Sequence, residues 1–534
     1  MPSEPADSAV ADRRLHPLSI FFGFAAQIPK LVLPGVFVLF SARSSQWAEW
    51  QLWAMLLLIP YTLVAVGRYI TLRYRYEPHE IVIRTGLLFR NERHIPYSRI
   101  QNLDAVQNVL HRLAGVVEVR VETGGGQKAE ATMRVLPVAA YEEMRRRVFA
   151  GKAAEAVAEG EAAESVPVPA STPERTLLRM PLHDLLICGF IENRGIVIIG
   201  AGFGLLWEAG LMDRLMGRWL RVNGPGGGLP EWFGGDAPGG GLSAAVVKAF
   251  LGQGELPLTR IALALTAFAG ILLLIRLLSM IWALLRLYGF RIVRAGEDLR
   301  TEYGLLTRVV ATIPLRRIQT LTIREGPLHQ LFRRAAVRVE TAGGGGGGDG
   351  EEESTAKQRE WLAPLIHRDA LPGFLREVLP EADLSTVEWR PVEPRAFRRH
   401  LKKSLIADVL IALPFVLMLK FWTLALLAVF IAWSVVAAHL YVRHLGWAVI
   451  DGAVLFRSGW LWRRVSVARF AKIQAVTIHE SPWDRRAAMA RVRVDTAGAR
   501  GEAQRVDIPY LARDTARALY ELLSGQAAQT AFRW

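Results

Sequence analysis

A single cysteine, Cys188, is present among the 534 residues, so the chain can form neither an intramolecular disulfide nor a cysteine-based zinc site. Its 47 glycines show no Gly-X-Y period, which excludes a collagen-like helix. The sequence contains no H-E-x-x-H, no G-x-S-x-G and no phosphate loop that ends in Gly-Lys-Ser/Thr. These absences predict a protein that is not an enzyme and that holds no cofactor and no metal ion.

Charged and apolar residues are unevenly distributed along the chain. Lys and Arg number 65 against 50 Asp and Glu, a net charge of +15, and 51% of the residues are hydrophobic. The mean hydropathy is +0.21 although 22% of the residues are charged. The apolar residues must therefore be concentrated in segments of their own, which excludes a disordered chain and a single uniform globule.

The apolar residues form six stretches that come in three pairs. A membrane helix needs about 20 largely apolar residues, a length that the second and the sixth stretch clearly reach. The pairing, and tryptophans near the ends of the stretches, favour three membrane hairpins over buried core helices. The pairs are Ile28–Phe40 with Leu52–Leu72, Gly195–Leu211 with Ile261–Leu285, and Leu405–Leu419 with Phe421–Leu440.

The flanks of the hairpins predict their orientation. Six arginines lie at the end of the first pair and after it, between Arg68 and Arg93, whereas only Arg43 lies between its two members. The positive-inside rule therefore places both termini and the segments between the hairpins in the cytoplasm, as in a multi-pass protein of the cell (inner) membrane. The glycine-rich loop 212–258 is then an extracytoplasmic insert.

A mixed apolar and basic stretch precedes each hairpin. These stretches are Arg13–Lys30, Arg175–Arg194 and Arg395–Lys403. Each is either an amphipathic helix on an anionic membrane surface or a simple basic flank.

One module occurs three times after the hairpins. The segments that begin at Gly86, Gly304 and Gly459 align without gaps as far as Gln101, Gln319 and Gln474, and then as far as the threonines at 123, 341 and 496. A register held three times over this length indicates a true internal repeat. Alternation in VEVRVET, AVRVET and RVRVDT predicts half-buried antiparallel strands. An apolar-periodic helix is expected at the end of each copy.

The motifs GLL-x-R, IP-x-x-RIQ and VRVETAGG resemble those of the membrane-flanked bacterial pleckstrin-homology-like (PH-like) domain, as in YdbS/YdbT-like proteins. The resemblance implies a bent seven-strand sandwich with a capping helix, and it implies no catalytic activity. The third copy departs from the pattern between Val467 and Lys472, where the others have IP-x-x-R. Its ligand face, if it has one, differs.

The expected fold class is a mixed membrane protein, with three helical hairpins alternating with three small PH-like β-sandwich domains that each end in a helix. The predicted boundaries are 1–73 for the tail and hairpin 1, 74–150 for PH-like domain 1, 151–180 for a linker, 181–287 for hairpin 2, 288–382 for domain 2, 383–443 for hairpin 3 and 444–525 for domain 3.

Two groups of polar residues are candidates for a site. A cation stands two positions before a glutamine in every copy, so that in a strand both would share one face, ready to bind a headgroup or a partner's carboxylate. The alternative is structural, with the glutamine bonding buried backbone and the cation covering the sheet. These pairs are Arg99 with Gln101, Arg317 with Gln319, and Lys472 with Gln474.

Arg276 and Asp408 form the second group, because both fall at membrane depth. They could line a conduction path, pair with each other between hairpins, or reach the surface from a helix end.

The sequence therefore predicts a membrane scaffold or binding module. The expected partners are the bilayer, anionic lipid headgroups, and a second membrane protein or another copy of the chain, but not nucleic acid. The alternative is a component of a transport or export system that uses the intramembrane charges.

Overall fold

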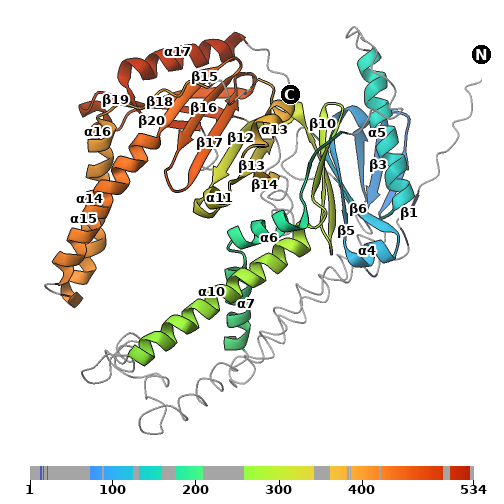
Figure 1. The fold of residues 1–534 in the computed structure, drawn as a ribbon. Helices are drawn as coiled ribbons and strands as arrows, with labels where there is room; N and C mark the ends of the chain where they lie inside the picture. Colours follow the sequence, from blue (N-terminus) through green and yellow to red (C-terminus); the bar gives the residue numbers. More distant parts are fainter. Residues whose placement is uncertain are drawn as a thin grey trace, which may run out of the picture.

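The computed structural model describes residues 13–14, 16, 21, 72–86, 90–123, 131–158, 175–208, 258–341, 361–381, 384, 387–419, 422–496 and 506–529. The predicted first hairpin up to residue 71 and the loop residues 212–257 lie outside this described part. The three domains lie side by side in chain order, and the apolar helices extend from one side of the row (Figure 1).

Each copy of the repeat folds into the same order of elements. Three strands, a 3-10 turn, a fourth strand, a short helix, two further strands and a closing helix follow one another. In domain 1 these are β2 (Arg73–Tyr76), β3 (Glu80–Thr85), β4 (Asn91–Pro96), η1 (Tyr97–Arg99), β5 (Ile100–Gln107), α4 (Val109–Leu113), β6 (Val116–Thr123), β7 (Ala131–Pro137) and α5 (Val138–Ala158).

Domains 2 and 3 repeat this order. Domain 2 contains β9 (Arg291–Ala295), β10 (Asp298–Tyr303), β11 (Arg308–Pro314), η3 (Leu315–Arg317), β12 (Ile318–Glu325), α11 (Pro327–Leu331), β13 (Arg334–Thr341), β14 (Trp361–His367) and α13 (Leu371–Val378). Domain 3 contains β15 (Gly446–Ile450), β16 (Ala453–Ser458), β17 (Arg463–Arg469), η4 (Phe470–Lys472), β18 (Ile473–His479), α16 (Pro482–Arg486), β19 (Met489–Thr496), β20 (Val506–Ala512) and α17 (Arg513–Gln529).

The glycine that starts each aligned segment follows the second strand of its domain. Gly86, Gly304 and Gly459 have φ angles of 113°, 111° and 82°. A Cβ atom on Gly304 would lie 1.9 Å from the carbonyl oxygen of Thr307. Only glycine fits such a turn without moving the backbone, which explains why all three copies have glycine at this position.

A further strand, which precedes the apolar stretches in the sequence, extends the first sheet of domains 1 and 2. Strand β1 (Arg13–Arg14) pairs with β2, and β8 (Arg175–Arg179) pairs with β9. In domain 3 a single bridge between Arg390 and Trp447 takes the same place. In domains 1 and 2 the expected seventh strand thus precedes the predicted hairpin in the sequence. The prediction of a linker over 151–180 is corrected at its end, because backbone pairing with β9 makes 175–179 part of the sheet.

Helix α6 (Leu182–Ile191) also belongs to domain 2. Leu185 and Cys188 are buried in the same cluster as the strands of that domain. A Cβ atom on Gly189 would lie 2.5 Å from the Cα atom of Met280, so α6 meets α10 (Leu258–Leu287) backbone against backbone. The stretch Arg175–Arg194 is therefore neither a surface helix nor a plain flank, because its apolar side chains fill a core.

The described helices support fewer spans than the six predicted. Two are long and apolar enough to cross a membrane, over Leu265–Leu287 and Leu427–His444. The pair formed by α6 and α7 (Gly195–Glu208), bent by 60°, would add a third if it acts as one span. Helix α14 (Ala396–Leu419) packs along α15 (Trp422–His444), but its first half is basic.

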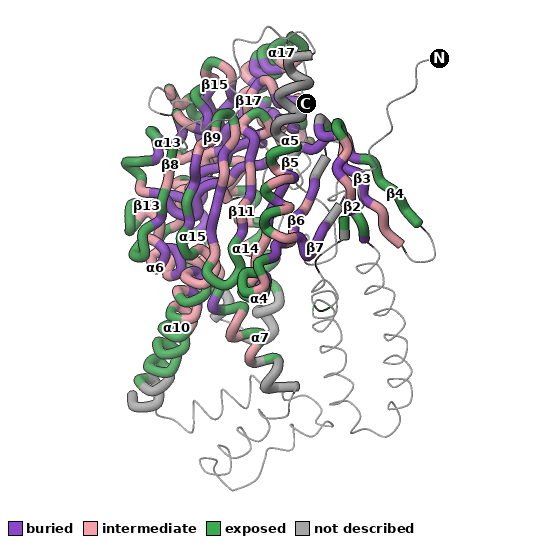
Figure 2. The backbone as a smooth tube through the Cα atoms, turned by 90° about the vertical axis from the view of Figure 1, so that its right-hand side faces the viewer, coloured by how far each residue is buried: buried purple, intermediate pink, exposed green. Residues whose placement is uncertain are grey.

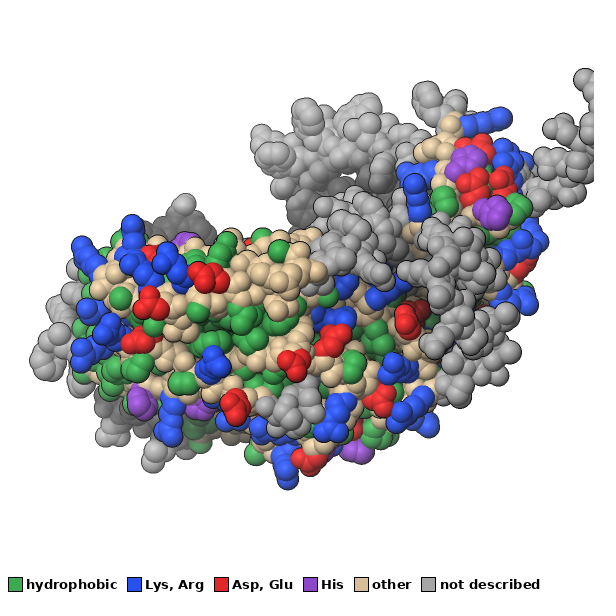
Figure 3. Space-filling model, turned by 90° about the horizontal axis from the view of Figure 1, so that it is seen from above, with side chains coloured by type: hydrophobic (Ala, Val, Ile, Leu, Met, Phe, Trp, Pro, Cys, Tyr) green, Lys and Arg blue, Asp and Glu red, His purple; other side chains and the backbone are tan. Residues whose placement is uncertain are grey.

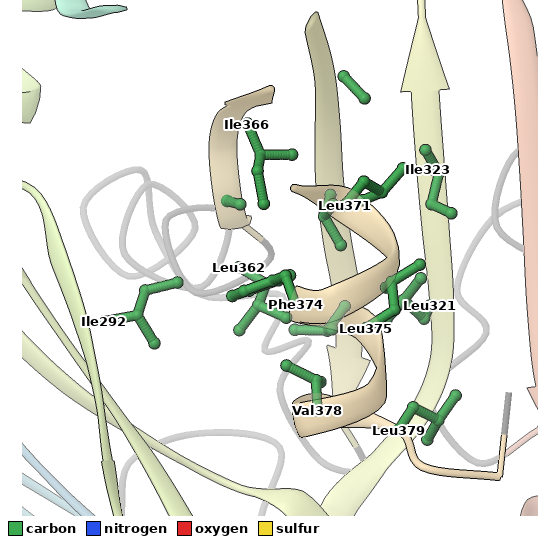
Figure 4. Close-up of a cluster of buried hydrophobic side chains, with 14 of the residues drawn as sticks. Ile292, Leu321, Ile323, Leu362, Ile366, Leu371, Phe374, Leu375, Val378 and Leu379 are labelled. Carbon is green, nitrogen blue, oxygen red and sulfur yellow. The ribbon is translucent and has the colours of Figure 1, made fainter. Parts of the chain in front are cut away.

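The buried residues follow the strands and the closing helices, whereas α10 is largely exposed along its length (Figure 2). In domain 2 the side chains of Leu371 and Leu375 on α13 lie beside Ile323 and Leu321 of β12, and Phe374 lies beside Leu362 (Figure 4). The exposed apolar surface of α10 and α15, each 11% buried over its span, is what a helix in lipid requires.

Candidate functional site

The strands of successive domains pair with one another. Strand β5 of domain 1 pairs with β11 of domain 2 at the first junction, and β12 of domain 2 pairs with β17 of domain 3 at the second. The sheets therefore run as β7-β6-β5-β11-β10-β9-β8 and β14-β13-β12-β17-β16-β15, which leaves β1-β2-β3-β4 at one end and β18-β19-β20 at the other.

The two junctions use the same register. Gln107 lies opposite Arg308 at the first, and the equivalent Glu325 lies opposite Arg463 at the second. The short helix that follows each junction strand, β5 or β12, also contacts the next domain. Arg112 of α4 donates a hydrogen bond to the carbonyl oxygen of Leu305 (3.1 Å), and the equivalent Gln330 of α11 donates one to that of Leu461 (2.9 Å).

Each following domain closes the core of the domain before it. We call the side of a domain's first three strands that turns away from the domain's own core its outward face. In domains 2 and 3 this side turns toward the preceding domain. In domain 3 the outward face is apolar at six positions, and all six side chains join or pack against the core cluster of domain 2. They are Ala448, Ile450, Ala453, Leu455, Val465 and Val467.

The outward face of domain 2 is more polar. Val310 packs against the core of domain 1, and Glu302 is surrounded by Arg291 (2.6 Å), Arg300 (3.1 Å) and Arg308 (3.1 Å). Burial raises the pKa of Glu302, but the hydrogen bonds from Arg291 and Arg308 outweigh it and hold the pKa below its ordinary value. The carboxylate therefore stays charged, and it neutralises the cations beside the first junction.

The three repeated cation and glutamine pairs do not form one common face. The cation of each pair ends a 3-10 turn (η1, η3 or η4), while the glutamine is the second residue of the strand that follows. The expectation that both lie on one face of a strand is wrong, because the alternation of side chains holds only within extended backbone. Arg99 is exposed, Arg317 is half-buried and Lys472 is buried.

The glutamines differ as well. Gln319 is 3% exposed, and its Nε2 atom donates a hydrogen bond to the carbonyl oxygen of Arg317 (3.3 Å). Gln474 is exposed, and the side chain of Gln101 lies outside the described atoms. Burial lowers the pKa of Lys472, and the nearby Arg469 and Arg316 lower it further.

The side chain of Arg276 forms hydrogen bonds at the break between α6 and α7. Its guanidinium group donates hydrogen bonds to the carbonyl oxygen of Phe190 (2.9 Å) and to the Oδ1 atom of Asn193. The Oδ2 atom of Asp408 has no hydrogen-bond partner among the described residues. Where the structure is described, Arg276 and Asp408 form no ion pair with each other. Arg276 therefore satisfies the carbonyl oxygen that the end of α6 leaves unpaired.

A pocket lies where α10 enters domain 2. Arg194 and Arg286 line it together with Glu192, Trp361 and Tyr303. Glu192 pairs with Arg194 at 3.1 Å, so the pocket holds two guanidinium groups and one carboxylate. On the face turned away from the apolar helices, by contrast, basic and acidic side chains are interspersed (Figure 3). The pocket thus places two cations at the end of α10 where this helix joins domain 2.

Comparison with known proteins fits this architecture. The family model of the bacterial PH domain matches the chain three times, over residues 25–152, 244–365 and 407–527. The chain belongs to the bacterial PH domain family. It is 24% identical to the UPF0699 transmembrane protein YdbT of Bacillus subtilis (strain 168), over 89% of this chain and 90% of that protein. No solved structure matches the chain.

Each match to the bacterial PH domain includes a predicted membrane stretch and the domain that follows it. The residues at the two junctions were not predicted from the sequence. Comparing the outward-face positions between copies would have been the available signal, because those of domain 3 are apolar throughout and those of domain 1 are largely charged.

A single substitution distinguishes a structural glutamine from a ligand-binding one. Gln319→Ala should lower the free energy of unfolding by about 1–3 kcal/mol, because it removes the hydrogen bond that the buried Gln319 side chain donates to the Arg317 carbonyl group. Gln474→Ala, the same change at an exposed equivalent position, should change it by less than about 0.5 kcal/mol. Denaturant unfolding of the purified protein measures both. Equal costs at the two positions would contradict the structural role of Gln319.

Proposed function

We propose that this protein is a non-enzymatic membrane scaffold, whose bacterial PH domains form one row at the membrane surface and bind a protein partner or an anionic lipid. The pairing of strands across both junctions is the observation that supports it most. Domains on separate flexible tethers would sample many relative positions, whereas domains that share a sheet keep their register. A fixed row of domains suits assembly on a membrane.

We also propose that the domains and both termini lie in the cytoplasm. The argument is the excess of basic residues beside the apolar stretches, with Arg395, Arg398, Arg399, Lys402 and Lys403 at the start of α14. A transport role has less support, because Arg276 is engaged by Phe190 and Asn193 at the break between two helices.

The lipid half of the proposal rests on the pocket that Arg194 and Arg286 line. Basic pockets at the cytoplasmic ends of membrane helices suit lipid headgroups, and each Lys or Arg near an anionic surface contributes about 1 kcal/mol. The neighbouring cations Arg333 and Arg334 are less suited to binding a lipid headgroup than this pocket is. Arg334 is ion-paired with Asp184 of α6 at 2.7 Å and mostly buried, so it holds α6 against domain 2.

A charge placed in the second junction tests the fixed row. Val467→Asp should bury a carboxylate in the domain 2 core, a cost of at least about 2 kcal/mol. Domain 3 should then detach, and hydrogen exchange should show faster exchange at β12 while β6 and β19 stay protected. Val467→Thr, which copies Thr312 of domain 2, and His94→Asp, at the equivalent exposed position of domain 1, should leave β12 protected. Unchanged protection of β12 in the aspartate variant would contradict the scaffold.

Lipid binding is tested at the pocket. Arg194→Gln and Arg286→Gln should each weaken binding of phosphatidylglycerol roughly five-fold, the equivalent of about 1 kcal/mol, with little effect on phosphatidylcholine. Native mass spectrometry of the full chain, titrated with each lipid, measures this. Arg517→Gln, the same loss of charge on exposed α17, is the control. An equal loss in all three variants would mean that net charge, rather than the pocket, attracts the lipid.

Topology is tested with a phosphatase reporter, which is active only outside the cytoplasm. A reporter fused after Trp534 should be silent, and one inserted in the glycine-rich segment 224–241 should be active. The reverse pattern would overturn the cytoplasmic position of the domains.

A further inference from the structure

Strand β18 of domain 3 is equivalent to β5 of domain 1 and β12 of domain 2. Those two strands pair with the next domain, whereas within the described residues β18 pairs only with β19. An edge strand of this kind presents unpaired N–H and C=O groups that can accept another strand.

The apolar side chains beside this edge are left uncovered. Ile323 of β12 is 4% exposed, but the equivalent Ile478 of β18 is 39% exposed. Leu375 of α13 is 3% exposed, but the equivalent Tyr520 of α17 is 36% exposed. In domain 2 both positions belong to the cluster that the outward face of domain 3 closes. Within the part of the chain that the structure describes, domain 3 therefore exposes these two equivalent positions, with no sheet over them.

Domain 3 also carries polar side chains at the positions that make contacts across the two junctions. Arg485 of α16 stands at the position of Arg112 and Gln330, which bond to the next domain, and it is exposed. Glu480 stands at the position of Glu325, which lies opposite a cation of the next domain. Glu480 is paired with Arg513 (2.8 Å), much as Glu325 lies 3.9 Å from Arg368. The pairing with Arg513 is thus part of the repeated arrangement.

The outward face of domain 1, at the other end of the row, has the opposite character. Five of its six positions carry ionisable side chains, and these pair among themselves: Arg75 with Glu77 (2.7 Å), and His94 with Glu80 (2.7 Å) and Glu92 (3.7 Å). Docking this face against an apolar core would remove the charges from water at a cost that their mutual attraction does not recover. Charged edge strands prevent such pairing.

We propose that the edge of β18, together with α16 and α17, is a docking site for the first sheet of a PH-like domain on a separate polypeptide. This inference rests on the proposed scaffold function and names its partner. The two internal junctions define what the partner must offer: a third strand that pairs with β18, and a cation at the position of Arg308 and Arg463, opposite Glu480. Its outward face must also be largely apolar, as that of domain 3 is, because the surface beside β18 is apolar. A second copy of this chain does not qualify, because its outward face is the charged one of domain 1.

The test converts domain 1 into a donor for this site. A donor chain carries at four outward-face positions of domain 1 the residues of domain 2, and it also carries Ile478→Lys so that its own β18 site is blocked. The four substitutions are Arg75→Val, Glu77→Ala, Glu92→Val and His94→Thr. Mixed with the wild-type chain in detergent, the donor should form a complex of one donor and one wild-type chain, as measured by native mass spectrometry.

Two controls make the result specific. The complex should be lost when the wild-type chain is replaced by its Ile478→Lys variant, and the donor alone should be a monomer. The wild-type chain alone should also be a monomer, with the amides of β18 exchanging faster than those of β12.

Each contrary outcome overturns the proposal. Without a complex, β18 does not accept an apolar outward face. A complex that survives Ile478→Lys uses another surface, and slow exchange at β18 in the wild-type monomer means that the edge is already covered. These failures are distinguishable from a failure of the scaffold, because the Val467→Asp experiment tests the second junction without involving β18.

Discussion

Hydrogen bonding at the edges of small sheets is the constraint on which this architecture depends. A three-stranded sheet has two edges, and the backbone groups along each must find partners or face water. In this chain the last sheet of one domain takes the first sheet of the next as its partner, at β5 with β11 and at β12 with β17. The order of the domains, the burial of their outward faces and the contacts of the short helices all follow from that pairing.

Much of the fold is readable from the sequence because it is local and repeated. The turn glycines at 86, 304 and 459 have positive φ angles that no other residue adopts easily, and the alternating segments are strands. The pairing between domains is not readable in this way. Strands β5, β12 and β18 all start from the same Ile-Gln sequence, yet two are covered and one is open, because the difference lies in the domain that follows.

The candidate site was predictable only in part for a related reason. The repeated cation and glutamine are equivalent in sequence, but Gln319 lies in a junction and is buried, whereas Gln474 lies on the open strand and is exposed. A 3-10 turn also separates each cation from its glutamine, which an extended-strand interpretation does not anticipate. Strand β8 is likewise not predictable from its local sequence, because its partner β9 follows only after α6, α7 and α10.

Domain 2 is built from segments on both sides of α7 and α10, and this sets an order for its biosynthesis. Strand β8 and helix α6 leave the ribosome before α10, and the strands that they pack against follow only after it. The core then still lacks the outward face of domain 3, which is made after α14 and α15. Domain 2 therefore cannot complete its core as an independent unit during synthesis. It keeps apolar surface open until the first three strands of domain 3 have followed.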